Sequence, residues 1–237
     1  MIINGGIRVK RKRILLLGSG LAVLLSGCGG FHLRGTIPDY KEETYITSSK
    51  VKDIVLQDED VPVEICDSDN GQLYLSYYSA DDGSEKYKIK ESKGVLAVEK
   101  ESKRNQGIFI FGDQYSSDSY KKVKLTLFLP NDYNGNLSIQ TMDGNIVIED
   151  ITLKNLIINT NDGDVFFYDT TVTQSLSCKT KDGQVKGTLC GTESEYTVKT
   201  KSKNIDNRTN IKTGSNKSID IITKDGLIDI LFNSKNE

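Results

Sequence analysis

Four aspartates at matching places in a repeated motif are the residues with which this chain could perform chemistry. The motif Thr-x-Asp-Gly places them at Asp143, Asp162, Asp182 and Asp225. Paired carboxylates hydrolyse glycosidic bonds, and rows of carboxylates bind calcium. Alternatively, each aspartate forms a turn with its glycine, because Asp tolerates turn conformations and Gly lacks a Cβ. The turn interpretation accounts for all four, so we assign no catalytic residue, no metal ligand and no cofactor.

Other catalytic groups are scarce. The only histidine is His32, and the chain contains no HExxH, GxSxG or phosphate-loop motif. Cys66, Cys178 and Cys190 lack metal-ligand spacing. Cys178 takes the place of an aliphatic residue in the repeat, so we expect a small buried side chain there; a disulfide with Cys190 is the alternative. The sequence therefore predicts a protein that is not an enzyme.

Lysines beside the repeated threonines form a second candidate site. They occupy outward positions in the last three repeats, which predicts a basic stripe on one face. Such a stripe binds polyanions such as cell-wall polymers or lipid headgroups; a solvated face that discourages aggregation is the alternative. The members of the stripe are Lys179, Lys181, Lys199, Lys201 and Lys224.

The repeat itself predicts the fold. Apolar and polar residues alternate around each motif, so Leu137, Ile139 and Ile146 face a core while Ser138 and Gln140 face water. The threonines Thr141, Thr160, Thr180, Thr200 and Thr223 recur at intervals of 19, 20, 20 and 23 residues. Antiparallel hairpins are the local alternative, because Asp-Gly is a strong hairpin signal. The near-constant period favours an all-β, parallel β-solenoid with coils of about 20 residues, resembling a right-handed β-helix, in which the threonines stack.

The remaining chain divides by composition. Residues 51–130 contain short apolar runs with a looser rhythm, which predicts an irregular N-terminal β cap before the solenoid repeats of residues 131–237. Residues 28–50 contain Gly, Pro38 and charged residues with little periodicity, which predicts a flexible tether.

The N-terminus reads as an export signal. A basic cluster from Arg8 to Arg13 precedes a twelve-residue apolar run, Ile14 to Leu25, which is too short to span a membrane. Leu25, Ser26, Gly27 and Cys28 follow. This pattern resembles the lipobox of bacterial lipoproteins, which implies removal of the signal peptide 1–27 and lipidation of Cys28. An ordinary secretory signal is the alternative.

Charge excludes one class of partner. Removing residues 1–27 removes five of the 31 Lys and Arg residues and none of the 33 Asp and Glu residues. An acidic mature chain is not expected to bind nucleic acid, which requires a basic domain. The expected location is the outer face of the bacterial cytoplasmic membrane, held by the lipid on Cys28.

Repeated Thr-x-Asp-Gly-x-Ile/Val units, preceded by short strands and a Leu-Pro pair and lying behind a lipobox, also point to a family. Over residues 50 to 232 the chain resembles the bacterial "putative adhesin" domains of unknown function with β-strand repeats. The resemblance implies an exported or membrane-tethered protein, with links in some members to cell-envelope stress responses.

Three functions follow from these observations. The first is a non-enzymatic, lipid-anchored envelope scaffold that contacts envelope proteins for adhesion, envelope organisation or stress sensing. The second is a module that binds anionic wall polymers through the lysine stripe. The third is a calcium-assisted, polysaccharide-active enzyme of β-helix architecture.

Overall fold

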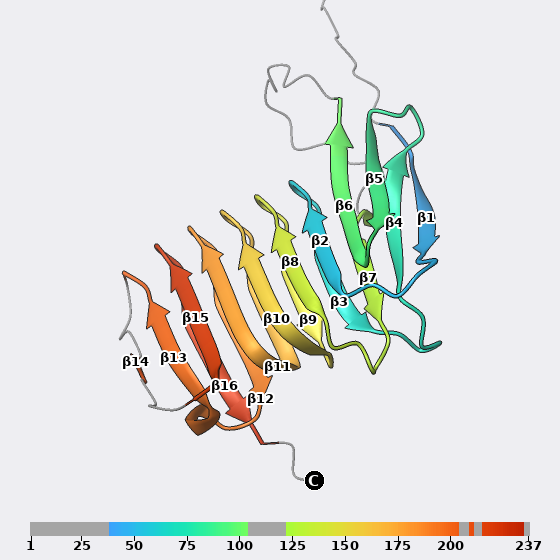
Figure 1. Ribbon diagram of the computed structural model, residues 1–237. Coiled ribbons are helices and arrows are strands. Elements are labelled where there is room, and N and C mark those ends of the chain that lie inside the picture. Colours follow the sequence, from blue (N-terminus) through green and yellow to red (C-terminus); the bar gives the residue numbers. More distant parts are fainter. Residues whose placement is uncertain (1–37, 104–121, 204–208, 211–214, 235–237) are drawn as a thin grey trace, which may run out of the picture. The chain divides into compact units, whose positions relative to one another are not determined.

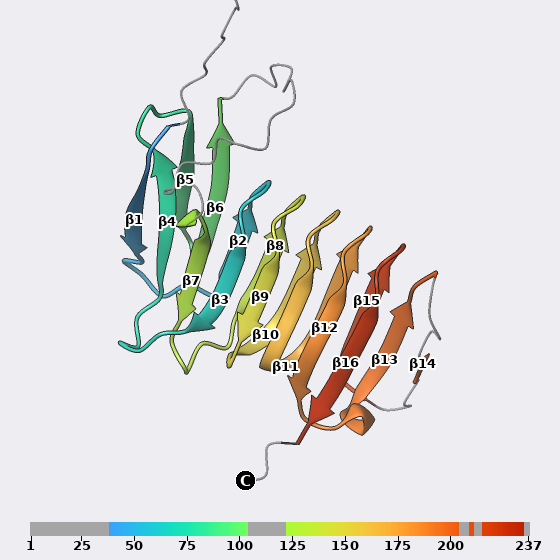
Figure 2. The same cartoon turned by 180° about the vertical axis from the view of Figure 1, so that it is seen from behind.

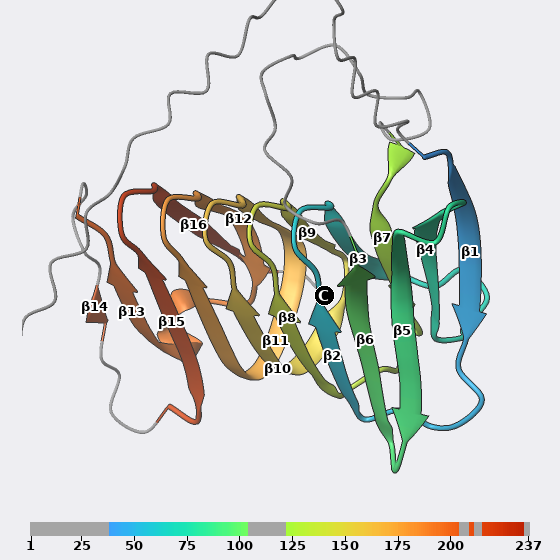
Figure 3. The ribbon, with the colours of Figure 1, turned by 90° about the horizontal axis from the view of Figure 1, so that it is seen from above.

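The computed structural model describes residues 38–103, 122–203, 209–210 and 215–234. Most of these residues lie in β-strands, and they include a short 3-10 turn, η2 (Glu193–Glu195). The strands lie in two sheets, A and B, which face each other across a common core (Figure 1, Figure 3). The prediction of an all-β, solenoid-like repeat fold is confirmed.

Sheet A is mainly parallel, with antiparallel pairs at its N-terminal side (Figure 2). In spatial order it contains β1 (Tyr40–Ile46), β4 (Tyr74–Ala80), β7 (Leu125–Leu129), β3 (Val63–Asp67), β9 (Ile146–Glu149), the first part of β11 (Val165–Thr180), β12 (Val185–Cys190) and β16 (Ile228–Asn233).

Sheet B has the same character, with antiparallel pairs at both ends. In spatial order it contains β5 (Glu85–Ser92), β6 (Val95–Ser102), β2 (Asp53–Gln57), β8 (Asn136–Gln140), β10 (Thr152–Asn159), the second part of β11, β15 (Lys217–Thr223), β13 (Tyr196–Lys201) and β14 (Thr209–Asn210).

Each coil contributes one strand to each sheet. The chain leaves sheet B through a Thr-x-Asp-Gly turn, enters sheet A, and returns through a second corner. At that corner β11 passes from sheet A to sheet B without interruption, and Asp169 adopts a positive φ of 45°. Asp150 occupies the matching corner one coil earlier with a φ of 50°. Aspartate tolerates this left-handed conformation better than most residues, which explains its use at both corners.

The Thr-x-Asp-Gly turns stack through hydrogen bonds from one coil to the next. The Thr160 hydroxyl donates to the Met142 carbonyl at 3.0 Å, and the Thr180 hydroxyl donates to the Asn161 carbonyl at 3.0 Å. The same carbonyls also accept backbone N–H groups of the next turn, so each threonine adds a side-chain bond to the backbone bonds that join the coils.

The turn glycines are required by close packing between coils. A Cβ built on Gly183 would lie well inside contact distance of the Gly163 carbonyl oxygen, and one on Gly226 would meet the Gly183 carbonyl oxygen in the same way. None of these turn glycines has a positive φ. The glycine is thus required because its missing Cβ leaves room for the neighbouring coil, and not because the turn is left-handed.

In sheet B the last two strands of the stack, β13 and β15, lie in the reverse of their chain order, whereas β12 and β16 keep chain order in sheet A. β15 pairs with β11, placing Thr223 opposite Thr180, and β13 pairs on the far side of β15. The prediction that Thr200 continues the threonine stack is wrong, because Thr200 lies opposite Ile221. Ser202 takes that role: it is buried, and its hydroxyl donates to the Gly226 carbonyl at 2.9 Å.

The segment 51–130 contains strands of two kinds. β2 and β3 form a coil of the stack, since they pair in parallel with β8 and β9, far away in sequence. β6 and β7 add a further parallel layer beyond them. β4 and β5 are antiparallel to their neighbours. The N-terminal side of both sheets is therefore built from β4 to β7, which lie between β3 and β8 in the sequence, together with β1.

β1 falls within residues 28–50, the predicted tether. It pairs with β4 along all seven of its residues. At its end, Glu91 of β5 accepts hydrogen bonds from the Tyr45 hydroxyl of β1 at 3.2 Å and from the Ser48 N–H at 3.0 Å. These bonds connect the start of sheet A to the edge of sheet B.

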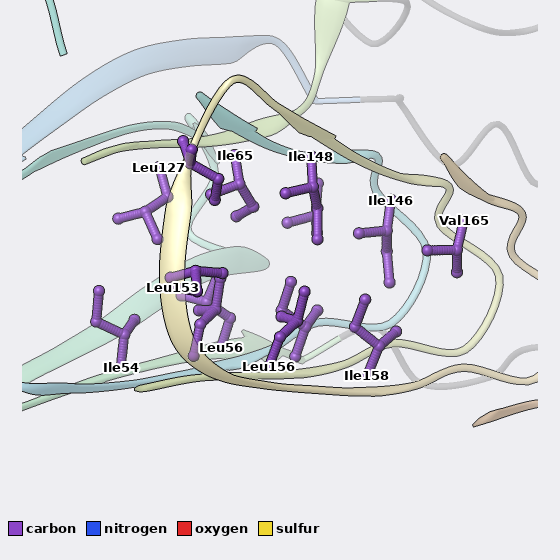
Figure 4. Close-up of a cluster of buried hydrophobic side chains, with 14 of the residues drawn as sticks. Ile54, Leu56, Ile65, Leu127, Ile146, Ile148, Leu153, Leu156, Ile158 and Val165 are labelled. Carbon is purple, nitrogen blue, oxygen red and sulfur yellow. The ribbon is translucent and has the colours of Figure 1, made fainter. Parts of the chain in front are cut away.

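The core is a single row of aliphatic layers between the sheets. Figure 4 shows Ile146 and Ile148 of sheet A facing Leu156 and Ile158 of sheet B. Each of these four side chains is fully buried, as are Leu137 and Ile139, so the predicted inward and outward faces are confirmed. Cys178 is also fully buried as a free thiol, and burial raises its pKa to about 12.

Candidate functional site

The five lysines of the predicted stripe lie in two places. Lys179 of β11 and Lys199 and Lys201 of β13 are exposed on the outer face of sheet B, whereas Lys181 and Lys224 are exposed in the turns. Because β15 lies between β11 and β13, Ile222 separates Lys179 from Lys201 in their cross-strand row. The strand order therefore places the lysines of β11 and β13 two strands apart instead of on adjacent strands.

The two turn lysines are paired with the motif aspartates. Lys181 lies 3.0 Å from Asp182, and Lys224 lies 3.4 Å from Asp225. Asp182 raises the pKa of Lys181, and Lys181 lowers the pKa of Asp182. These pairs are exposed and contribute little stability, but they balance charge along the turn edge. Among the described residues, no carboxylate lies within ion-pair distance of Lys179, Lys199 or Lys201.

The aspartates of the motif form an exposed row along the turn edge. Asp143 and Asp162 have no lysine at the preceding position, where Met142 and Asn161 stand instead. Within the described parts of the chain, no group of three or more His, Cys, Asp or Glu side chains is arranged to hold a metal ion. These aspartates lie in turns that stack from one coil to the next.

An amide row crosses the outer face of sheet B, and sequence reasoning missed it. Asn136 donates to Asp53 at 2.6 Å, Asn155 donates to Asn136 at 2.8 Å, and the Ser175 hydroxyl donates to Asn155 at 2.6 Å. The signal was present in the sequence, since Asn136, Asn155 and Ser175 each precede the first core residue of their repeat by one position. The row makes this face polar and fixes the register of four strands.

The outer face of sheet A has a different chemistry. Aromatic side chains occupy alternate, outward positions in β4, β7 and β11, and the rings of Tyr74 and Phe128 stack with centroids 4.3 Å apart. Tyr168 and Leu231 are 49% and 58% exposed. Large apolar side chains on the solvent side of a sheet commonly mark an interaction surface.

A buried charge cluster joins the β5–β6 hairpin to the end of β2. The Lys100 ammonium lies 3.4 Å from Glu85 and 3.9 Å from Asp58, and all three side chains are at least nine-tenths buried. The Tyr87 hydroxyl donates to Asp58. Burial raises the pKa of Asp58 while Lys100 opposes that rise, and burial and Asp58 together raise the pKa of Tyr87. Two carboxylates thus share one ammonium inside the protein.

Fold and surface together define the class: an all-β repeat protein whose stacked coils expose two long, chemically distinct faces. The chain belongs to the family described as Toastrack DUF4097, whose model matches residues 51–237.

One solved structure supports this fold. A crystal structure described as a putative cell adhesion protein from Clostridium sporogenes matches with a TM-score of 0.54 at 13% identity, covering 82% of this chain and all of that one. A putative adhesin from Bacteroides fragilis is 14% identical over 82% of this chain and 97% of its own, with a TM-score of 0.34. A search of curated protein sequences finds no match. Among the described residues, no helix has the length and apolar character needed to cross a membrane. Cys28 lies outside the described residues.

Proposed function

We propose that this protein is a non-enzymatic, lipid-anchored scaffold of the bacterial cell envelope. The observation that supports the proposal most is the uninterrupted stack of coils, whose core is fully buried while its two outer faces stay open to partners. A stack of this kind presents extended surfaces for adhesion, envelope organisation or stress sensing. We also propose that the coils wind right-handed, as nearly all parallel crossover connections do.

The anchor is proposed at Cys28, which would hold the chain on the outer face of the cytoplasmic membrane. Two acyl chains are needed because one alone gives only marginal membrane residence. In cells supplied with a radiolabelled fatty acid, we expect label in the wild-type chain and none in Cys28→Ala, with the variant lost from the washed membrane fraction. Cys66→Ala is the matched control and should remain labelled. An unlabelled wild-type chain would disprove the anchor.

The scaffold role is tested by crosslinking the chain to its neighbours in native membranes. We expect specific envelope proteins to be captured in similar amounts from independent preparations, and to be lost when the outer face of sheet A or of sheet B is substituted. If capture is unchanged by substitutions on both faces, the faces do not bind partners and the scaffold proposal fails.

A second candidate function is binding of anionic wall polymers. It is favoured by Lys179, Lys199 and Lys201, which are exposed without a carboxylate partner among the described residues. Reversing these three lysines to glutamate should abolish retention on an immobilised glycerol phosphate polymer. Reversing Lys86, Lys88 and Lys90, which stand on β5 at the other end of sheet B, changes the net charge equally and serves as the control. Equal losses in both variants would indicate only non-specific attraction.

A further inference from the structure

A row of aromatic and acidic side chains crosses the outer face of sheet A over five neighbouring strands. Tyr74 of β4 lies opposite Phe128 of β7, which lies opposite Cys66 of β3. Glu149, at the end of β9, lies opposite Tyr168 of β11. Ile65 of β3 pairs with Ile148 of β9, and the next residues along these strands are Cys66 and Glu149. Cys66 and Glu149 are therefore neighbours, and the row is continuous. We call these five residues the aromatic row.

The neighbouring row on the same face adds the same kinds of side chain. Glu64 of β3 lies opposite Val147 of β9, and Val147 lies opposite Phe166 of β11. The apolar part of this face is therefore shared by at least four strands, and carboxylates lie within it rather than around it.

Carboxylates outnumber lysines around Cys66, at the centre of the face. Cys66 lies among the carboxylates of Glu64, Asp67 and Glu149, which add to burial in raising its thiol pKa to about 11, and only Lys124 opposes them. Lys124 is itself bound to Glu64, at 2.6 Å. Among the described residues, Glu149 has no basic partner within ion-pair distance. Anionic lipid headgroups and acidic polymers would be repelled from such a face.

Exposed aromatic rings beside unpaired carboxylates are the chemistry that recognises a guanidinium group. Arginine stacks on a tyrosine ring through cation–π contact and forms two hydrogen bonds with one carboxylate. The row spans four strand spacings of about 4.8 Å, so an extended peptide of about six residues covers it. We propose that the aromatic row docks an extended, arginine-containing segment of a partner polypeptide. This inference rests on the proposed scaffold function and names the partner class for one face.

Fluorescein-labelled hexaarginine is the probe, titrated with the purified full-length chain in detergent at low salt and followed by fluorescence anisotropy. We expect saturable binding that Tyr168→Ser and Glu149→Gln each weaken about three-fold, the scale of one exposed cation–π contact. Hexalysine should bind more weakly, because its ammonium cannot form the bidentate contact. Both substituted side chains are exposed, so thermal unfolding should be unchanged.

Matched controls come from the outer face of sheet B. Glu99→Gln removes the same charge from exposed Glu99, and Ile157→Ser removes an apolar side chain that is 44% exposed. Both should bind hexaarginine as the wild type does. Absence of hexaarginine binding would overturn the proposal, and so would an equal loss of affinity in the control variants. Binding that is lost when the chain is kept from self-associating would overturn it as well. The scaffold proposal is judged separately, by crosslinking in membranes.

Discussion

At the scale of single residues, the repeat is explained by what each side chain does for the coil next to it. The glycine of each Thr-x-Asp-Gly turn allows the neighbouring carbonyl to approach, and the threonine hydroxyl donates to a carbonyl one coil away. The aspartate stays in solvent. The glycine therefore recurs in four repeats because close packing between coils requires it. The aspartate before it recurs because its side chain suits a turn.

Gly183→Ala tests this requirement. The added methyl group would meet the Gly163 carbonyl, so the coils must separate, and we expect a loss of about 3 kcal/mol in the free energy of unfolding, at the upper end for an overpacked site. Chemical denaturation measures the loss. The adjacent exposed change Asp182→Ala should cost less than about 0.5 kcal/mol. Similar values for the two variants would show that the turns do not pack as described.

At the scale of elements, the β5–β6 hairpin is attached to the stack by backbone pairing and by the buried cluster of Asp58, Glu85, Tyr87 and Lys100. Such a cluster is costly to bury, and removing one partner leaves the others without compensation. The charges of the cluster are paired only when β5, β6 and the end of β2 lie together. The cluster therefore favours one position of the hairpin on the stack.

Lys100→Met should destabilise the protein by about 3 kcal/mol at pH 7, because two buried carboxylates lose their shared ammonium. Burial already raises the pKa of Asp58, so the folded chain binds this proton more tightly than the unfolded chain does. The resulting stability is present at low pH and is lost as pH rises through the folded pKa. The cost of Lys100→Met should therefore be smaller at pH 4 than at pH 7.

Urea unfolding at both pH values measures this difference, with Lys88→Met as the control, because the Lys88 side chain is 44% exposed. A cost that is the same at pH 4 and pH 7 would show that the carboxylates are not responsible for it.

The sequence predicted the faces of the strands better than their order. The alternation around Leu137 and Ile139 identified the buried side chains, and the repeat indicated Cys178 as a core residue. The register of β13 was not predictable from alternation, because a shift of two residues keeps every side chain on the same face. Thr200 and Ser202 therefore both fitted the pattern, and the hydrogen bond from Ser202 to Gly226 distinguishes them. The aromatic row was missed because its residues come from distant segments.

At the scale of the whole molecule, each coil contacts mainly its two neighbours. Stability in such a stack is approximately the sum of local terms and contacts between adjacent coils. The coil formed by β15 and β16 lies near one end, and β2 and β3 lie several coils away. A perturbation at the end should therefore remain local.

Gly226→Ala, which disturbs the contact with Gly183, should reduce amide hydrogen-exchange protection in β15, β16 and β13 by at least ten-fold. Protection in β2, β3 and β8 should stay within two-fold of the wild type. Exchange followed by mass spectrometry of peptides resolves these segments. Gly183→Ala, deeper in the stack, is the comparison and should affect strands on both sides. A uniform loss throughout the chain would mean that the stack unfolds as one unit.

The pairing of β2 with β8 has a consequence for how the chain matures. Residues 53–57 meet residues 136–140 only after the whole intervening segment has emerged, whereas β8, β9, β10 and β11 follow one another closely in sequence. Contacts between distant segments form slowly because the long loop must first close. We therefore expect assembly to nucleate in the contiguous middle repeats, and the contact of β2 with β8 to form after them. During that interval the edge of β2 that later pairs with β8 is open, and an open strand edge is a site where another chain can pair.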